Sequence, residues 1–179
     1  TAESLYILGD FFESWIGDDE NTELQLGVKQ ALKRFTDKGA KLYFMHGNRD
    51  FLIGELFAQE TGASLLEDPC IMDLAGESVL LMHGDSLCTG DTSYMKFRAT
   101  IRNPAFLEPF LKRPIEERKI TAQQLRAMSQ ANNQNKSMGI MDVTPEEVVK
   151  EMNAHNIHTL IHGHTHRPEI HETKHDGTD

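Results

Sequence analysis

Residues 5–10, Leu-Tyr-Ile-Leu-Gly-Asp, form a short apolar run that ends in a glycine and an aspartate. Such a run predicts a buried strand that brings Asp10 to its carboxyl end. Ligands of α/β proteins bind outside the carboxyl ends of the strands. The stretch therefore predicts an α/β fold and makes Asp10 the first candidate site residue.

The same pattern, in which polar side chains directly follow an apolar strand, occurs three more times along the chain. The strands are 41–45, 78–82 and 157–161, and the segments after them are His46-Gly47-Asn48-Arg49-Asp50, His83-Gly84-Asp85 and His162-Gly163-His164-Thr165-His166. Four strand ends with polar side chains predict a shared site at one edge of the fold.

Helical patterns lie between these strands. Thr22 is suited to cap a helix that runs to about Lys38, with Gly39 as its stop. Further helices are predicted over 51–60, 94–111, 115–132 and 145–154, a hairpin joins 70–74 to 78–82, and 168–173 alternates like a strand before the turn signal Asp176-Gly177. Alternating strands and helices with one hairpin predict an α/β sandwich, with the helices over 94–132 as an elaboration.

The composition is typical of a globular protein. The 179 residues, 39% hydrophobic and 26% charged, predict one domain. No apolar run approaches the roughly 18 residues of a membrane span, and residues 1–8 lack the pattern of a secretory signal, so we expect a cytoplasmic location. The two cysteines, Cys70 and Cys88, lack Cys-x-x-Cys spacing, which argues against a disulfide framework and against a thiolate zinc site.

Charge is distributed unevenly along the chain. The formal net charge is -10, yet residues 96–136 hold nine Lys or Arg and only three Glu. A basic block in an acidic protein indicates a surface that faces phosphates or anionic lipid head groups, although a solvated helix face explains such a run equally well. The sequence leaves both interpretations open.

Five side chains at the strand ends are candidate metal ligands: Asp10, Asn48, His83, His164 and His166. Carboxylate, amide oxygen and imidazole donors suit manganese, iron or zinc in a catalytic site, whereas a structural zinc favours thiolates. Two such ions, roughly 3.5 to 4 Å apart, can activate a water and stabilise charge in a phosphoryl transfer. His164 and His166 are two apart, so on an extended segment they would point the same way.

Each candidate also has a simpler interpretation. A Gly-Asp pair after a strand is often only a turn, and a lone histidine such as His83 is often a satisfied core residue. The occurrence of four such strand ends in one chain favours the metal site over these alternatives.

The motifs resemble successive blocks of the calcineurin-like metallophosphoesterases. These blocks are Gly9-Asp10, Gly47-Asn48-Arg49-Asp50, His83-Gly84-Asp85 and Gly163-His164-Thr165-His166. The resemblance is closer still to the branch of this family that acts in lipid A synthesis, in which an arginine stands where most members have a histidine, as Arg49 does here. It extends to Trp15-Ile16-Gly17-Asp18-Asp19 and Ile140-Met141-Asp142-Val143, and thus covers nearly the whole chain.

The resemblance implies an αββα sandwich whose core is residues 1–93 and 143–179, with an inserted helical cap over 94–142. It also implies two divalent ions, and we expect these to be Mn²⁺. One would be held by Asp10, Asn48, His83 and His164, and the other by Asp10, His166 and two residues of an Asp-x-His strand that would precede Thr1. Because that first strand and a last strand are not in this sequence, we expect it to be part of a longer protein.

The activity implied by the resemblance is hydrolysis of the diphosphate of UDP-2,3-diacylglucosamine at the cytoplasmic face of the inner membrane. Arg49 would be catalytic, with Arg49 and Lys136 beside the phosphates. The implied substrate contacts are Asn48, Arg49, Asp91, Ser129, Asn133, Lys136 and His164. The inserted helices would receive the acyl chains and rest on the anionic membrane surface, and no nucleic acid polymer is expected as a partner.

Two other functions stay open at this point. A phosphoesterase of the same fold that acts on a nucleotide or phosphoprotein would have no apolar groove beneath residues 94–132. A non-catalytic scaffold would bind a partner through the basic helices and would cleave no diphosphate even with its metal sites filled.

Overall fold

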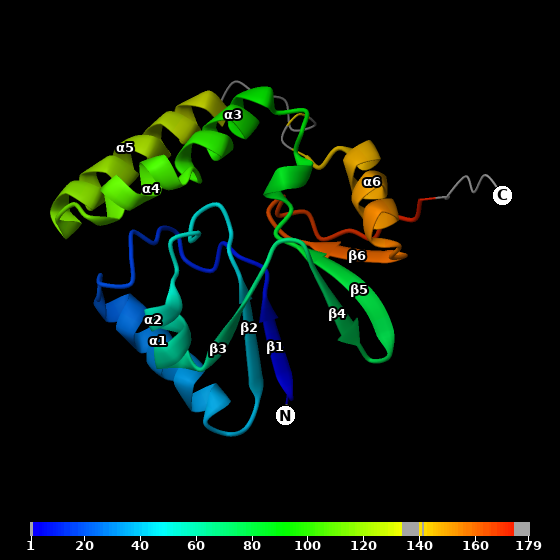
Figure 1. The fold of residues 1–179 in the computed structure, drawn as a ribbon, viewed down its shortest axis with the longest axis horizontal. Helices are drawn as coiled ribbons and strands as arrows, with labels where there is room; N and C mark the ends of the chain where they lie inside the picture. Colours follow the sequence, from blue (N-terminus) through cyan, green and yellow to red (C-terminus); the bar gives the residue numbers. More distant parts are fainter. Residues whose placement is uncertain (1, 134–139, 141, 174–179) are drawn as a thin grey trace.

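Two three-stranded sheets form the centre of the computed structural model, which describes residues 2–133, 140 and 142–173 (Figure 1). The first sheet is parallel, in the order β1 (Ser4–Ile7), β2 (Lys41–Met45) and β3 (Ala63–Leu66). In the second, β5 (Glu77–Met82) lies between the antiparallel β4 (Cys70–Leu74) and the parallel β6 (Thr159–His162). The strands predicted over 5–8, 41–45, 70–74, 78–82 and 157–161 are confirmed to within two residues at each end, and β3 is an additional one.

The apolar side chains divide into three clusters that define the layers. Met45 of β2 packs with Val79 and Leu81 of β5, so the two sheets face each other. On the outer face of the first sheet, Phe44 and Phe57 belong to a cluster with α1 (Glu23–Thr36) and α2 (Glu55–Thr61). On the outer face of the second, a cluster around Leu80 and Met82 packs against α6 (Pro145–His155). The order helix, sheet, sheet, helix is the αββα sandwich that was expected.

Local sequence explains α1 well. The Thr22 side chain accepts a hydrogen bond from Gln25 N, and the Gln25 side chain accepts one from Thr22 N, which completes a capping box. Leu32 faces the core. The helix ends at Thr36, close to the predicted end, and Gly39 follows with a φ of 88° that favours glycine.

The helix predicted over 51–60 begins later, at Glu55. The reason is tertiary. The Asp18 carboxylate, from a distant loop, accepts hydrogen bonds from Gly54 N and Phe57 N, and so supplies the cap that Gly54 lacks. Residues 51–54 therefore form a turn instead of the first helical turn.

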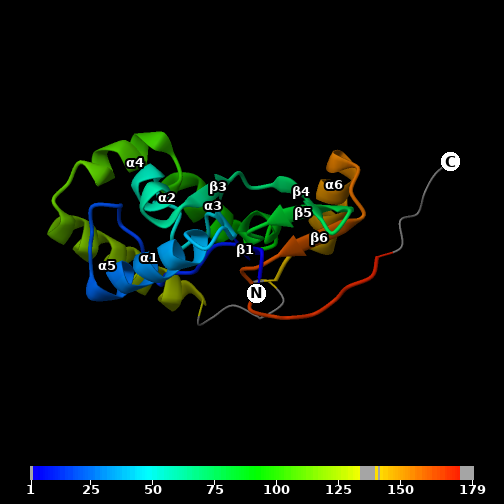
Figure 2. The same ribbon diagram turned by 90° about the horizontal axis from the view of Figure 1, so that it is seen from below.

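The helix predicted over 94–111 is two helices, α3 (Thr92–Ile101) and α4 (Pro104–Leu111). Pro104 has no N–H and takes the first position of α4, while Asn103 caps that helix by accepting from Ala105 N. Together with α5 (Ile115–Asn133), they lie across one end of the sheets, as Figures 1 and 2 show. We call α3, α4 and α5 the overlying helices.

Residues 168–173 do not form the strand that their alternation predicts. Ile170 is 92% exposed, so the segment has no sheet to pack on within the described residues. Asp176 and Gly177 lie outside the described part of the chain. Among the helices that the structure describes, none combines the length and apolarity needed to cross a membrane.

Candidate active site

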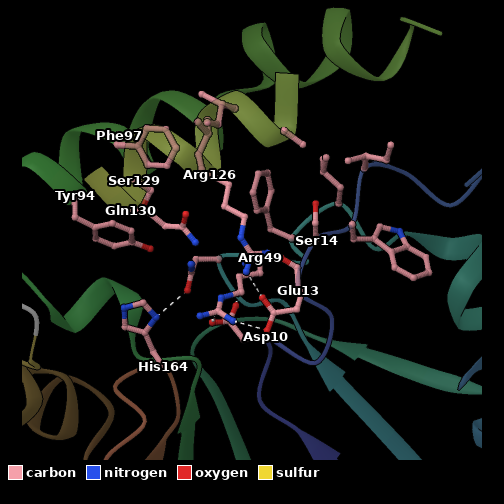
Figure 3. A pocket seen from close by; sticks show the side chains of 18 of the residues that line it. Asp10, Glu13, Ser14, Arg49, Tyr94, Phe97, Arg126, Ser129, Gln130 and His164 are labelled. Atoms are coloured by element: carbon pink, nitrogen blue, oxygen red, sulfur yellow. Dashed lines mark hydrogen bonds and ion pairs between the residues drawn. The ribbon is translucent and has the colours of Figure 1, made fainter. Parts of the chain in front are cut away.

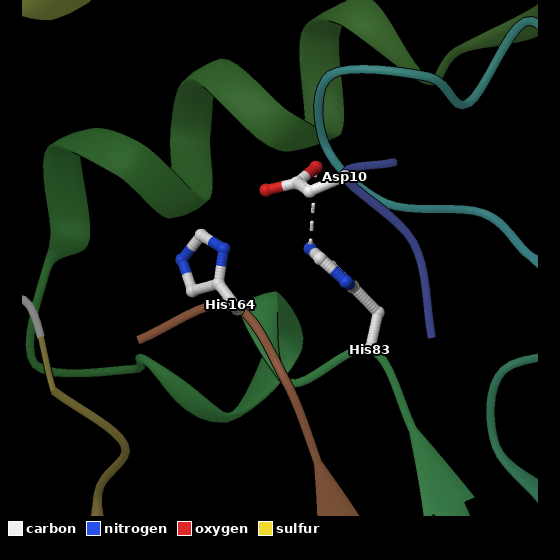
Figure 4. A group of neighbouring side chains, drawn as sticks. All are labelled: Asp10, His83 and His164. Carbon is white, nitrogen blue, oxygen red and sulfur yellow. Dashed lines mark ion pairs between the residues drawn. The ribbon is translucent and has the colours of Figure 1, made fainter. Parts of the chain in front are cut away.

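Four of the five predicted metal ligands form one cluster. Ligand atoms of Asp10, His83 and His164 lie within 4.8 Å of one another (Figure 4). Asn48 lies between the two imidazoles, with its Oδ1 3.1 Å from His83 Nε2 and 2.8 Å from His164 Nδ1. The loops after β1, β2, β5 and β6 thus meet as the sequence predicts.

The orientation of His83 shows that the cluster suits a cation. This side chain is fully buried, and its Nδ1 donates a hydrogen bond to Leu8 O at 2.7 Å. In the neutral tautomer that this bond selects, Nε2 carries a lone pair directed at the Asn48 oxygen, which is itself an acceptor. Nε2 also accepts a long hydrogen bond from Asn48 N at 3.3 Å, but no proton lies between it and the Asn48 oxygen. Two acceptors that face each other in this way fit a divalent ion, and the backbone carbonyl behind His83 fixes its ring as in many metal sites.

The electrostatic surroundings of His164 keep its imidazole available as a ligand. Burial, followed by the nearby His83, lowers the pKa of His164 to about 4. The ring is therefore neutral near pH 7, which is the form that binds a metal ion. The Tyr94 ring lies 5.7 Å from the His164 ring, centroid to centroid, and covers it on the side of the overlying helices.

The lowered pKa of His164 predicts a pH-dependent stability of the metal-free protein. The ring takes up its proton near pH 6.5 in the unfolded chain but only near pH 4 in the folded one. Because the unfolded state binds more protons in this window, the free energy of unfolding falls as the pH drops from 6.5 towards 4. Denaturant unfolding across the window should show a shallower fall in His164→Asn, a residue that tolerates the left-handed backbone. Equal slopes would contradict the assignment.

The backbone is left-handed at three of the predicted ligands. Asp10, His164 and His166 have φ values of 54°, 69° and 56°, which are unfavourable for residues other than glycine. Residues 164–166 are thus not extended, and the argument that His164 and His166 point the same way is wrong. His166 is exposed at the cavity wall and is not part of the three-residue cluster, so its role as a ligand stays a prediction.

Asp50 holds two of the ligand loops together. Its fully buried carboxylate accepts hydrogen bonds from four backbone N–H groups, those of Asp10, Phe11, Phe12 and Gly47. Burial raises the pKa of the Asp50 carboxyl, and the four donors oppose that rise. Sequence reasoning assigned no role to this residue, although a carboxylate that ends a strand-end motif next to Arg49 could have indicated one.

A cavity of about 570 Å³ lies between the cluster and the overlying helices (Figure 3). Its floor includes Asp10, Asn48, Arg49 and His164. Its upper wall is largely apolar, with Phe97, Ile101, Phe106, Leu107, Phe110 and Leu125 from the overlying helices. The site is therefore polar at one end and apolar at the other.

Most of the predicted substrate contacts line this cavity. Arg49, Asp91 and Ser129 do so, together with Asn48 and His164. Asp91 caps α3 by accepting from Tyr94 N at 2.9 Å. Asn133 is the last residue of α5, and Lys136 lies outside the described residues.

Glu13 and Arg126 also belong to the site, although the sequence did not single them out. Arg49 Nη1 donates to Glu13 Oε1 at 3.1 Å, and Arg49 Nε lies 3.7 Å from Asp10 Oδ2. From α5, Arg126 donates to Glu13 O at 2.8 Å and pairs with the Glu13 carboxylate. The hydrogen bond from Arg126 and the charge of Arg49 lower the pKa of Glu13. This carboxylate thus joins the floor of the cavity to α5.

Several members of the basic block contact carboxylates of the core, a use that neither interpretation of the sequence included. Arg98 and Arg102 pair with the buried Asp85. Arg118, which is only 2% exposed, pairs with Asp19 and donates to Ile16 O at 2.7 Å. These arginines fasten the overlying helices to the sandwich.

Comparison with known proteins agrees with this geometry. A family model for calcineurin-like phosphoesterases matches residues 3–168. The chain is 60% identical over 176 residues to a UDP-2,3-diacylglucosamine hydrolase of Marinobacter nauticus, which is 98% of this chain and 72% of that protein. It is 56% identical over 170 residues to the protein of that name from Hahella chejuensis, and the alignment covers 95% of this chain and 70% of that protein. For the protein of that name from Pseudomonas aeruginosa, the identity is 53% over 176 residues, which is 98% of this chain and 73% of that protein.

The family model spans most of the chain, and the relatives share more than half of the aligned residues over nearly all of its length. In the described part of the structure, carboxylate, amide and imidazole donors also lie in one cluster beside a cavity. The chain therefore belongs to the calcineurin-like phosphoesterase family, and within it to the UDP-2,3-diacylglucosamine hydrolases, which makes it a metal-dependent hydrolase.

Proposed function

We propose that this protein hydrolyses the diphosphate of UDP-2,3-diacylglucosamine to give UMP and 2,3-diacylglucosamine 1-phosphate, a step of lipid A synthesis. The observation that supports this most is the cavity, which joins a polar floor to an apolar wall. A lipid-linked UDP-sugar has the same two-part chemistry, with an anionic diphosphate beside acyl chains. A phosphoesterase for nucleotides or phosphoproteins would have no use for the apolar wall.

The residues at the floor fit divalent metal ions. We propose that Asp10, Asn48, His83 and His164 hold one ion, that Asp10 and His166 contribute to a second, and that both are Mn²⁺. When bound, such ions supply an activated water and stabilise charge on the phosphate. Asp10 suits the shared position because its carboxylate has two oxygens, of which one lies 3.8 Å from His83 Nε2.

Arg49 is the proposed catalytic residue of the chain itself. Its planar guanidinium matches phosphate oxygens and would stabilise the charge that shifts towards the leaving group. In the structure its side chain lies over the cluster, between Asp10 and Glu13. An incoming diphosphate would take the place of the Glu13 carboxylate on Arg49.

The overlying helices form the proposed lipid-binding part. We take residues 94–142 as a cap inserted into a core made of residues 1–93 and 143–179. Ser129, Asn133 and Lys136 of this cap would contact the substrate, together with Asp91. The exposed Ile120 and Met128 on α5, among basic residues, support peripheral association with the anionic inner face of the membrane.

The proposed function is tested by an assay of the full-length protein with Mn²⁺ and UDP-2,3-diacylglucosamine, with UMP release as the readout. We expect UMP to appear only with the metal present. Metal binding without cleavage of any diphosphate would favour the scaffold, and cleavage of nucleotides in preference to the lipid would favour the other phosphoesterase.

Narrowing the apolar wall should affect lipid substrates selectively. Ala122 of α5 lines the cavity, so Ala122→Trp should occupy space that the acyl chains need. We expect KM for the diacyl substrate to rise about tenfold, since the loss of one or two kcal/mol of apolar contact corresponds to such a factor. Hydrolysis of a water-soluble analogue without long acyl chains should change far less.

The matched control is Ala127→Trp, five residues along the same helix at an exposed position outside the cavity lining. It adds the same bulk to α5 and should leave both substrates unaffected. If Ala122→Trp slowed both substrates equally, the apolar wall would not be an acyl site.

A further inference from the structure

Arg102 connects the overlying helices to the loop that carries Asn48. It is the C-cap residue of α3, directly before the break at Asn103 and Pro104. One of its terminal nitrogens, Nη2, lies 3.1 Å from Gly47 O and 3.3 Å from Asp85 Oδ2. The break ends α3 at this point, and its C-cap arginine reaches the loop after β2.

The backbone of Gly47 is held at both of its polar groups. Its N–H donates to Asp50 Oδ1 at 2.8 Å, and its carbonyl accepts from Arg102. A Cβ at Gly47 would lie 2.2 Å from Asp10 N, so the loops after β1 and β2 pack backbone against backbone. A small rotation of the Gly47–Asn48 peptide would therefore be felt directly by the loop that carries Asp10.

The peptide that follows Gly47 carries Asn48. The Gly47 carbonyl and the Asn48 N–H belong to one rigid plane, and Asn48 N donates to His83 Nε2 at 3.3 Å. Rotation of this plane would move the Asn48 side chain away from His83 and His164. A donor fixed on the carbonyl opposes that rotation.

Buried contacts fix Arg102 in turn. Asp85 is fully buried, and its Oδ2 accepts from Tyr94 Oη and Arg98 Nε, each at 2.8 Å, in addition to Arg102. The Phe51 ring lies 5.3 Å from the guanidinium carbon of Arg102. The guanidinium is therefore oriented before any ligand binds.

We propose that Arg102 is a positioning residue for the metal site. By holding the Gly47 carbonyl, it keeps Asn48 Oδ1 between the two imidazoles. Among the described residues it contacts Gly47 O, Asp85 Oδ2 and the Phe51 ring and does not line the cavity, so it acts through the Gly47–Asn48 peptide. The inference rests on the proposed ligand role of Asn48.

The test compares Arg102→Met with Arg98→Met. Arg98 is a matched control because it lies on the same helix, pairs with the same oxygen of Asp85 and is 24% exposed against 23% for Arg102. Arg98 donates through its Nε to Asp85. Unlike Arg102, it makes no hydrogen bond to Gly47 among the described residues. Mn²⁺ affinity is measured on the full-length protein from the loss of the free-ion EPR signal.

We expect Arg102→Met to bind Mn²⁺ at least about tenfold more weakly, as is usual when a contact behind a ligand is lost. Saturating Mn²⁺ should restore much of its kcat, which a general loss of structure would not allow. Arg98→Met should lose thermal stability to a similar degree, because it too leaves Asp85 with one charged donor fewer, yet keep its Mn²⁺ affinity.

Wild-type Mn²⁺ affinity in Arg102→Met would overturn the proposal, and so would equal weakening in both variants, since charge balance at Asp85 would then explain the effect. If Arg102→Met does not fold, Arg102→Gln, whose shorter neutral side chain cannot reach Gly47, is judged by the same criteria. A wild-type protein that binds Mn²⁺ but leaves the lipid diphosphate intact would overturn the proposed function alone, because the readout here is metal affinity.

Discussion

Replacing His83 with alanine is expected to lower metal-dependent turnover at least about 1,000-fold, a loss of roughly 4 kcal/mol of transition-state stabilisation. The imidazole is fully buried, and its Nε2 faces the Asn48 oxygen and Asp10 at the centre of the cluster. Without it, the site keeps fewer donors and no rigid nitrogen at this position. The measurement is kcat/KM for the lipid substrate at saturating Mn²⁺, together with the number of ions bound.

This variant also needs a check of folding, because the Leu8 carbonyl loses its partner, at a cost of about 1–3 kcal/mol. Thermal unfolding provides the check. His155→Ala on α6 is the control, since that histidine bonds only within its own helix turn in the described structure. Unchanged turnover in a folded His83→Ala protein would remove His83 from the metal site.

The second large effect is expected from Asp50→Asn, on stability and activity together. Each carboxylate oxygen of Asp50 accepts two backbone N–H groups. An asparagine amide has only one oxygen, so its NH₂ group would face two N–H donors in a fully buried position. At about 1–3 kcal/mol for each of the two unsatisfied donors, we expect a loss of about 2–6 kcal/mol in urea unfolding.

The control for this change is Asp37→Asn at the end of α1, where the carboxylate pairs with Lys33 on the surface. An exposed pair of this kind contributes about 0–1 kcal/mol, so the control should unfold almost as the wild type does. Activity should also fall in Asp50→Asn, because Asp10 and Gly47 lose the group that holds their loops together. A stability close to wild type would show that the four hydrogen bonds contribute far less than their burial suggests.

The parts of the fold that the sequence predicted are those with local causes. Strand β2 spans the predicted residues, and α1 begins at the predicted cap, because a short apolar run and a capping box are both encoded within a few residues. The four-loop cluster was also predictable, since the carboxyl ends of neighbouring parallel strands meet at one edge. Asp10, Asn48, His83 and His164 confirm that argument.

The features that could not be predicted from the sequence depend on groups that are distant in sequence. The start of α2 is set by Asp18, and the role of Asp50 appears only when the loops after β1 and β2 are brought together. The left-handed backbone at His164 and His166 likewise belongs to a loop held by tertiary contacts, and no propensity of histidine predicts it. The split between α3 and α4 is the exception, because Asn103-Pro104 is a local signal that favours a helix start at this point.

The buried Arg118 bears on whether α5 can move away from the sandwich. Lifting α5 like a hinged cover would pull this guanidinium from the Ile16 carbonyl and the Asp19 carboxylate. The same movement would bring the apolar ceiling above the metal cluster into water. Both changes raise the free energy of the opened form, so the position of α5 over the cavity is the favoured one.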